Sequence, residues 1–226
     1  MKALVAWSSG KDCALALHRA RCNDGVTVTG ALTTVTETFG RVSIHGVREE
    51  VLRAQCDAAA LAPLIVPIPY PCPNEVYEER MAVALAEARR AGVTHVIFGD
   101  LFLGDVRAYR ERRLAGTGIA PLFPLWGLPT ATLARDIVAA GIEAYLVSVD
   151  LSRLPERFCG RRFDAALIAD LPPGVDPCGE NGEFHTCVVA GPMFSRRVAV
   201  TRSERVVRDG FAYCDLRLVP ESAAAR

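Results

Sequence analysis

The feature that most restricts the fold of this chain lies in its first 21 residues. Residues 3–7 form a short apolar run, Ser8, Ser9 and Gly10 follow, and apolar residues then recur at helical spacing over residues 12–21. A strand, a tight turn of small residues and a helix in this order are typical of a βα unit. Small residues let backbone amides approach phosphate oxygens, and the start of a helix adds free donors and partial positive charge. This segment predicts a phosphate-binding loop, although an ordinary turn in which Ser8 caps the helix has the same pattern.

Two charged residues, Lys11 and Asp12, close this turn. Lys11 supplies a cation for phosphate oxygens, and the Asp12 carboxylate is suited to hold a Mg²⁺ ion that bridges them. The segment is not a Walker A loop, because the first glycine of that pattern is missing and an aspartate follows the lysine. We expect the phosphate ligand to contact the residues from Ser8 to Cys13.

Up to about residue 150, short apolar runs alternate with helical patterns, which favours a parallel sheet with helices on both faces. Strands are expected at residues 3–7, 26–35, 64–69, 95–99 and 144–149, and helices at residues 12–21, 46–61, 74–91 and 130–140. Beyond residue 150 the pattern changes to proline-rich turns and short alternating segments. We therefore expect an α/β nucleotide-binding domain with five parallel strands in residues 1–150. Residues 151–226 are expected to form a small α+β region that binds the substrate.

Charge and composition restrict the partners. The 26 basic and 26 acidic residues cancel, so no overall field attracts nucleic acid, which we expect not to be a ligand. No uncharged stretch approaches the roughly 20 residues that cross a bilayer, and the N-terminus lacks a signal-peptide pattern. The eight cysteines contain no C-x-x-C pair, which favours reduced thiols. These observations predict a cytoplasmic protein, with a homodimer as the default assembly.

The turn resembles the PP-loop of the ATP pyrophosphatases, whose pattern is Ser-Gly-Gly-Lys-Asp-Ser. The chain departs from this pattern at Ser9 and at Cys13. Ser9 keeps the turn small but gives up the freedom of glycine at positive φ, and Cys13 replaces a hydroxyl with a weaker donor. The resemblance implies ATP and Mg²⁺ as ligands, cleavage between the α and β phosphates, and a Rossmann-like sheet of the HUP type.

Three later segments resemble the diphthine-ammonia ligase branch of these enzymes. They are Phe98-Gly99-Asp100, Pro124-Leu125-Trp126 and Gly179-Glu180-Asn181-Gly182-Glu183-Phe184-His185-Thr186. The last matches the family pattern Gly-Glu-x-Gly-Glu-[Phe/Tyr]-x-Thr, with His185 at a position where glutamate is common. Family members adenylate a carboxylate with ATP, release pyrophosphate and pass the acyl group to ammonia. The resemblance therefore implies a carboxylate-bearing acceptor, on a small molecule or a modified protein side chain, and ammonia as substrates.

The same segments supply candidate site residues. Gly99 and Asp100 lie at the end of the strand expected at residues 95–99, at the sheet edge where ligands bind. His45 follows the strand expected at residues 26–35 and is expected near the α phosphate. Asp100 as a helix cap and His45 as a solvated loop residue are the ordinary alternatives. Arg107 or Arg110, in the segment after Asp100, is suited to clamp an anion, although such charges usually lie on solvated surface.

The late motif, residues 179–186, is expected to contact the acceptor substrate. Its candidate residues there are Glu180, Gly182, Glu183, His185 and Thr186. The two glutamates are expected to be catalytic together with Lys11 and Asp12, while a solvated acidic loop is the alternative.

We therefore expect an ATP-dependent ligase or amidase-type synthetase. A tRNA-thiolating PP-loop enzyme is an alternative, but such enzymes use reactive cysteine pairs, and here Cys178 and Cys187 are the only late pair worth considering. A non-catalytic nucleotide sensor on the same fold is a second alternative.

Overall fold

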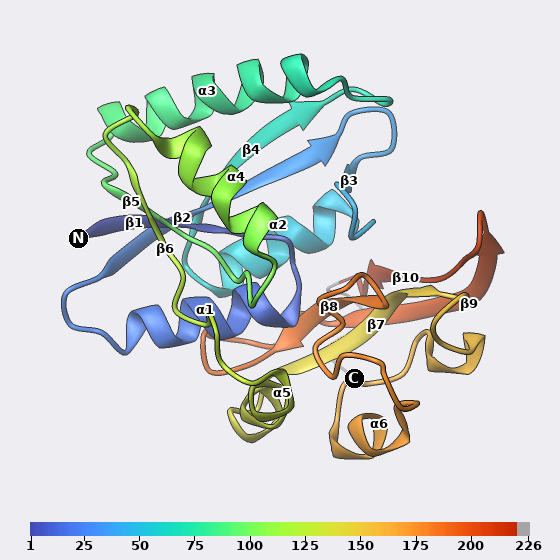
Figure 1. Cartoon of the computed structure of the whole chain (residues 1–226). Helices are drawn as coiled ribbons and strands as arrows, with labels where there is room; N and C mark the ends of the chain where they lie inside the picture. Colours follow the sequence, from blue (N-terminus) through green and yellow to red (C-terminus); the bar gives the residue numbers. More distant parts are fainter. Residues whose placement is uncertain (221–226) are drawn as a thin grey trace.

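The computed structural model describes residues 1–220 and contains two β-sheets with helices packed around them (Figure 1). Parallel pairing in the larger sheet runs β4–β2–β1–β5–β6, and the short β3 pairs antiparallel with β2. Five parallel strands on a helix-covered sheet confirm the α/β class expected from the sequence. The strands are β1 (Lys2–Ala6), β2 (Thr27–Thr36), β3 (Arg41–Val42), β4 (Ala62–Ile68), β5 (His95–Ile97) and β6 (Ala120–Leu122).

Helices cover both faces of this sheet. They are α1 (Lys11–Arg21), α2 (Glu49–Ala58), α3 (Asn74–Arg90), α4 (Gly104–Leu114) and α5 (Thr130–Ala139). Successive strand residues point to opposite faces, so Leu4 packs in the cluster with α3 and α4, whereas Ala3 and Val5 pack in the cluster with α1, α2 and α5. Of the α4 residues only Leu114 is buried, whereas α3 buries Ala84, Leu85 and Ala88 in the same cluster, and both helices lie on one face of the sheet (Figure 1).

The smaller sheet is antiparallel, in the order β8–β7–β10–β9. Its strands are β7 (Glu143–Asp150), β8 (Phe184–Ala190), β9 (Val200–Arg208) and β10 (Phe211–Leu218), and the short helices η1 (Glu156–Phe158) and α6 (Ala165–Asp170) lie between β7 and β8. The sequence placed residues 144–149 in the parallel sheet, and this was wrong, because β7 pairs with β8 and β10. The fifth parallel strand is β6, whose three residues are too few to show a period.

One hydrophobic core extends across both sheets. Leu17 of α1 and Leu133 of α5 belong to the same buried cluster as Leu146 of β7 and Val188 of β8. The Val188 amide also donates to the carbonyl of Ser9, 2.9 Å away, which fastens the second sheet to the turn after β1. The two sheets are therefore joined by packing and by a backbone hydrogen bond at the predicted phosphate loop.

An ion-pair cluster makes a second connection between the sheets. Asp215 of β10 accepts hydrogen bonds from Arg41 at 2.9 Å and from Arg48 at 2.8 Å. Burial alone would raise the pKa of Asp215, but the two guanidinium groups lower it below its ordinary value. None of the helices in residues 1–220 is long and apolar enough to cross a membrane.

Asp215→Asn should lower the free energy of unfolding by about 1–2 kcal/mol at pH 7, because it removes the charge that two arginines share. A carboxylate with a depressed folded-state pKa contributes stability above its ordinary pKa of 3.8, and this is lost as the pH falls through the folded value. Urea denaturation from pH 7 to pH 3 should show the difference from wild type shrinking. Asp209→Asn, an exposed carboxylate beside β10, should change little, and an equal effect of the two variants would contradict this role.

Candidate functional site

The turn between β1 and α1 has the shape of a phosphate loop. Ser9 is fully buried and has a φ of +70°, in the left-handed region that costs a non-glycine residue energy. Gly10 is the N-cap of α1, and no side chain caps this helix. Of the amides in the first turn, that of Lys11 donates to the Thr186 hydroxyl at 3.1 Å. The Asp12 and Cys13 amides follow in the same turn, which has no capping side chain, so they are placed to bind an anion.

Lys11 lies beneath this loop, with its side chain 2% exposed. Its ammonium group contacts the Asp12 carboxylate at 2.9 Å, donates to the carbonyl of Cys178, and lies over the rings of Phe163 and Phe184. Burial would lower the pKa of Lys11, but the Asp12 carboxylate outweighs it and the pKa is raised. The lysine is therefore a fixed cation that joins the phosphate loop to the late motif.

Cys13 acts as a structural thiol. Its Sγ donates to the carbonyl of Gly10 at 3.0 Å and accepts from the Ser8 hydroxyl at 3.5 Å. Burial raises its pKa to about 11, so it stays protonated at neutral pH.

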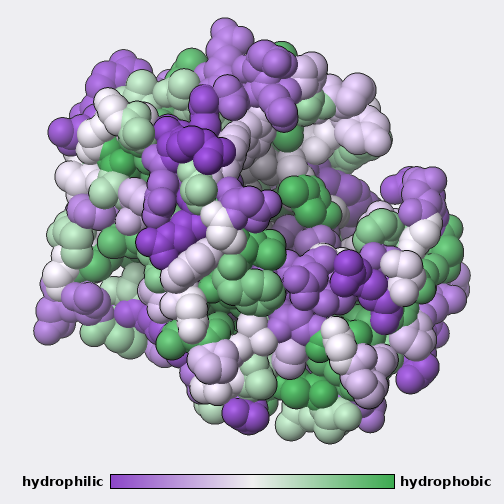
Figure 2. All heavy atoms as spheres, in the orientation of Figure 1, coloured by the Kyte–Doolittle hydropathy of each residue, from purple (hydrophilic) through white to green (hydrophobic). Residues whose placement is uncertain are grey.

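A cavity of about 950 Å³ opens beside the loop. Its walls come from the loop, the end of β2, the α3–α4 layer and residues 178–186. In Figure 2 a hollow lies between the upper lobe that carries α3 and the lower right lobe formed by the second sheet. This volume lies within the range of small-molecule sites, and the far end of the cavity, under α3 and α4, is lined by apolar residues such as Met81, Leu85 and Val96.

Buried polar atoms without a hydrogen-bond partner gather around this cavity. Within residues 1–220 they are Ser9 Oγ, Asp12 Oδ1, Thr33 Oγ1, His45 Nδ1, Asp100 Oδ2 and Arg110 Nε. All except Ser9 belong to residues that line the cavity. Buried polar groups are normally paired, so a group of unpaired ones around one hollow indicates a polar ligand.

Two histidines meet above the phosphate loop. The rings of His45 and His185 have their centres 4.5 Å apart, and a side chain added at Gly10 would come within 3.1 Å of His45. Burial lowers the pKa of His45 to about 3, assisted by His185, and burial with the Lys11 charge lowers that of His185 to about 4. Both imidazoles are therefore neutral at physiological pH. His45 is half-buried in the cavity wall, with its Nδ1 buried, so it is not a fully solvated loop residue.

The two glutamates of the late motif have different environments. Glu180 lines the cavity and accepts from the Leu101 amide at 2.8 Å, and burial raises its pKa to about 7. Glu183 is 1% exposed and accepts from the Asp176 and Asn181 amides at 3.2 and 3.0 Å. It does not line the cavity, so the structure assigns it to holding its own loop rather than to contact with a ligand.

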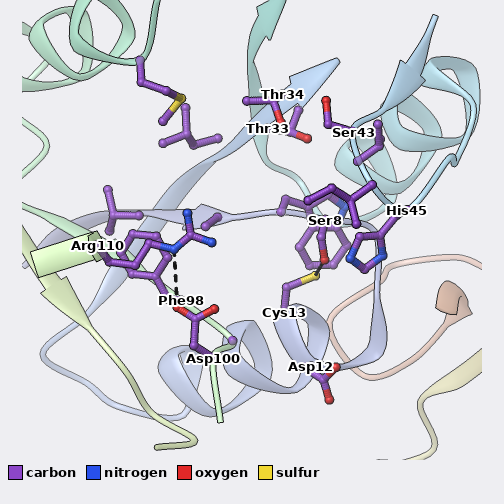
Figure 3. Close-up of a pocket in the computed structure, with 18 of the residues that line it drawn as sticks. Ser8, Asp12, Cys13, Thr33, Thr34, Ser43, His45, Phe98, Asp100 and Arg110 are labelled. Carbon is purple, nitrogen blue, oxygen red and sulfur yellow. Dashed lines mark hydrogen bonds and ion pairs between the residues drawn. The ribbon is translucent and has the colours of Figure 1, made fainter. Parts of the chain in front are cut away.

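On the opposite wall, Asp100 and Arg110 face each other at 3.5 Å (Figure 3). Burial raises the pKa of Asp100, and Arg110 lies over the ring of Phe98. Arg107, the other candidate, instead pairs with Glu111 at 2.8 Å outside the cavity. Of these two arginines, only Arg110 reaches the site.

Gly99 and Gly182 occupy tight positions. A side chain at Gly99 would come within 2.8 Å of the Cys13 amide, so only glycine lets this loop pack on α1. Gly182 has a φ of +85° in the turn that carries Glu180 and lines the cavity.

Cys178 and Cys187 are buried, and burial raises the pKa of both thiols well above the ordinary value. Thiolates are the reactive form of cysteine, so this pair is poorly suited to sulfur transfer. The sequence missed Thr33, Thr34 and Ser43 on the cavity wall; the only signal of the two threonines is a position near the end of β2, and Ser43 follows the short β3.

Ser9→Gly should raise the free energy of unfolding by about 1 kcal/mol, because glycine adopts a φ of +70° without a steric cost and the unpaired hydroxyl is removed. Thermal and urea unfolding measure the change. Ser9→Ala is the control, since it removes the hydroxyl but keeps the backbone strain. A stabilisation by alanine as large as that by glycine would contradict the assignment to backbone strain.

As the pH rises, wild type should lose stability relative to Glu180→Gln, because only wild type has a carboxyl to ionise at this position. The folded-state pKa of Glu180, about 7, lies above its ordinary 4.5, so ionisation opposes folding between these values and above. At pH 8 the difference should be about 1–2 kcal/mol after allowance for partial exposure, and it should vanish near pH 4.5. Urea unfolding at pH 5 and pH 8 tests this, with the exposed Glu204→Gln as control. Equal pH slopes in wild type and Glu180→Gln would refute it.

Comparison with known proteins is consistent with this site. A family model described as the diphthamide synthase C-terminal domain matches residues 129–219. A diphthine-ammonia ligase of Schizosaccharomyces pombe is 30% identical over 105 residues, which are 45% of this chain and 17% of that protein. Those of Rattus norvegicus and Homo sapiens are each 29% identical over 147 residues, which are 63% of this chain and 55% of theirs.

The chain thus spans about half the length of these mammalian relatives and a smaller part of the yeast one. The family model lies over the second sheet and α5, where the late motif contacts the phosphate loop. Together, these matches show that the chain is similar to diphthine-ammonia ligases, and the family model places this similarity in residues 129–219.

Proposed function

We propose that the chain is an ATP-dependent ligase that cleaves ATP to AMP and pyrophosphate, adenylates a carboxylate and transfers the acyl group to ammonia. The unpaired buried polar atoms around the cavity carry this proposal, because they need a polar ligand beside a loop shaped for phosphate. The relatives are diphthine-ammonia ligases, so diphthine is the first carboxylate to test.

The phosphates of ATP would be held by the free amides at the start of α1 and by its partial positive charge. Lys11 contributes its charge from below the loop. Asp100 and Arg110 on the opposite wall form an ion pair at 3.5 Å without a hydrogen bond between Oδ2 and Nε, and would receive polar groups of the nucleotide or the acceptor.

A Mg²⁺ ion fits the residues present. Asp12 Oδ1 is buried without a partner. Glu180 lies close to it, because the Asp12 charge adds to burial in raising the pKa of Glu180. No group of three or more His, Cys, Asp or Glu in residues 1–220 forms a metal cage. This suits Mg²⁺, which commonly uses one or two carboxylates with water and substrate phosphates. When bound, it would neutralise charge on the leaving pyrophosphate.

The reaction would proceed in two displacements. A carboxylate oxygen of the acceptor attacks the α phosphorus, and the bond to the β-phosphate oxygen breaks. The ammonia nitrogen then attacks the acyl carbon, AMP leaves with the bridging oxygen, and one proton is lost from nitrogen. Glu180, with a pKa near 7, is the group at the cavity best suited to take this proton, whereas the lowered pKa values of His45 and His185 leave these neutral imidazoles suited to hydrogen-bond the nitrogen.

We propose that residues 1–150 bind the nucleotide and residues 151–226 the acceptor, although β7 belongs by its hydrogen bonds to the second sheet. Eight free cysteines suit a reducing compartment, and we propose the cytoplasm. We propose a homodimer as the assembly.

Incubation with Mg²⁺ and α-labelled ATP tests the function. AMP and pyrophosphate should form, and diphthine with ammonium should increase the rate. Lys11→Met, which keeps an apolar stem between Phe163 and Phe184, should slow AMP formation by about 100-fold or more. Lys2→Met, at the chain's other lysine, should have no effect. ADP and phosphate as products, or full activity in Lys11→Met, would contradict the proposal.

A further inference from the structure

Gln55 is the only glutamine in the sequence and is fully buried on α2. It does not line the cavity. Its position within an amphipathic helix gives no signal of a special role in the sequence. A buried amide must find partners inside the protein, and its choice of partners is informative.

Its side chain joins three distant segments. The Gln55 Oε1 accepts from the Trp7 indole of the β1 end at 3.0 Å. Its Nε2 donates to the Val188 carbonyl of β8 at 2.6 Å and to the Ser9 carbonyl of the phosphate loop at 3.3 Å. One amide group therefore connects the end of β1, the loop and the edge of the second sheet.

The contact with Ser9 determines which way a peptide group of the loop faces. The Ser9 carbonyl accepts from Gln55 and from the Val188 amide, neither of which lines the cavity. In a trans peptide the N–H points opposite to the carbonyl. With the Ser9 carbonyl held on the Gln55 side, the Gly10 N–H faces the opposite way, as an anion-binding loop requires.

The same contact opposes the strain at Ser9. At a φ of +70° a serine is less stable than a glycine, and the chain needs outside contacts to hold it there. The hydrogen bonds to its carbonyl are such contacts.

We propose that Gln55 is a positioning residue for the phosphate loop. It holds the Ser9 carbonyl away from the cavity, so that the Gly10 amide faces the cavity and is presented to phosphate. The identity of the anion rests on the proposed function, whereas the orientation of the loop does not.

The experiment uses Gln55→Met, which keeps the length of the side chain but cannot hydrogen-bond, and Gln55→Glu, which keeps the acceptor for Trp7 but loses both donor contacts. Cys56→Ala, a buried residue of the same helix, is the matched control. Each is measured by hydrogen exchange without nucleotide and by titration with ATP and Mg²⁺.

Both Gln55 variants should speed exchange of the Lys11 and Val188 amides relative to the β9–β10 hairpin, and weaken ATP binding about tenfold. In a Ser9→Gly background, where positive φ carries little cost, Gln55→Met should weaken ATP binding only about threefold. If Gln55 had a purely structural role, the glycine at position 9 would not reduce the loss of ATP affinity. Cys56→Ala should leave ATP affinity within twofold of wild type.

Unchanged exchange at the loop in Gln55→Met, or a loss of ATP affinity equal in both Ser9 backgrounds, would overturn the inference. Failure of the wild-type protein to bind ATP would instead contradict the proposed function, and loop exchange alone would then decide the role of Gln55.

Discussion

The site depends on hydrogen bonds between the phosphate loop and a strand far along the chain. The Lys11 amide donates to Thr186, 175 residues away, and the Val188 amide donates to the Ser9 carbonyl. The Lys11 ammonium donates to the Cys178 carbonyl in the same region. The loop is therefore built jointly by the first βα unit and the late motif, and the shared hydrophobic core keeps the two in register. This explains why the smaller sheet packs against the carboxyl end of β1 rather than forming a separate domain.

The first βα unit and the helices 12–21, 46–61, 74–91 and 130–140 could be predicted from the sequence, because their apolar periodicity and turn residues are local. The loss of glycine freedom at Ser9 was also readable, and the structure has a positive φ there. The fifth parallel strand, β6, could not be predicted, because it has only three residues. The pattern of β7 indicates a strand but does not reveal the sheet to which it belongs. In the site, Glu180 and Glu183 look alike in sequence, and only the fold directs the first to the cavity and the second to its own loop.

Burial sets the chemistry of the charged and titratable groups around the cavity. Lys11 stays cationic through Asp12, the two histidines become neutral, and Glu180 is raised to a pKa near neutrality. A fixed cation beneath the phosphates and one carboxylate with a pKa near 7 suit a reaction that first releases an anion and then accepts a proton from nitrogen. The cysteines, in contrast, are held as protonated thiols, which disfavours sulfur transfer at this site.

The most direct measurement is a crystal structure with Mg²⁺ and α,β-methylene ATP, in which the bond expected to break is replaced. The account predicts the α and β phosphates at the amides that begin α1, the metal ion at Asp12, and residues 179–186 closing over the triphosphate with the loop unchanged in backbone. A nucleotide bound elsewhere, or phosphates contacting the loop without the late motif, would contradict the claim that the two segments form one ATP site.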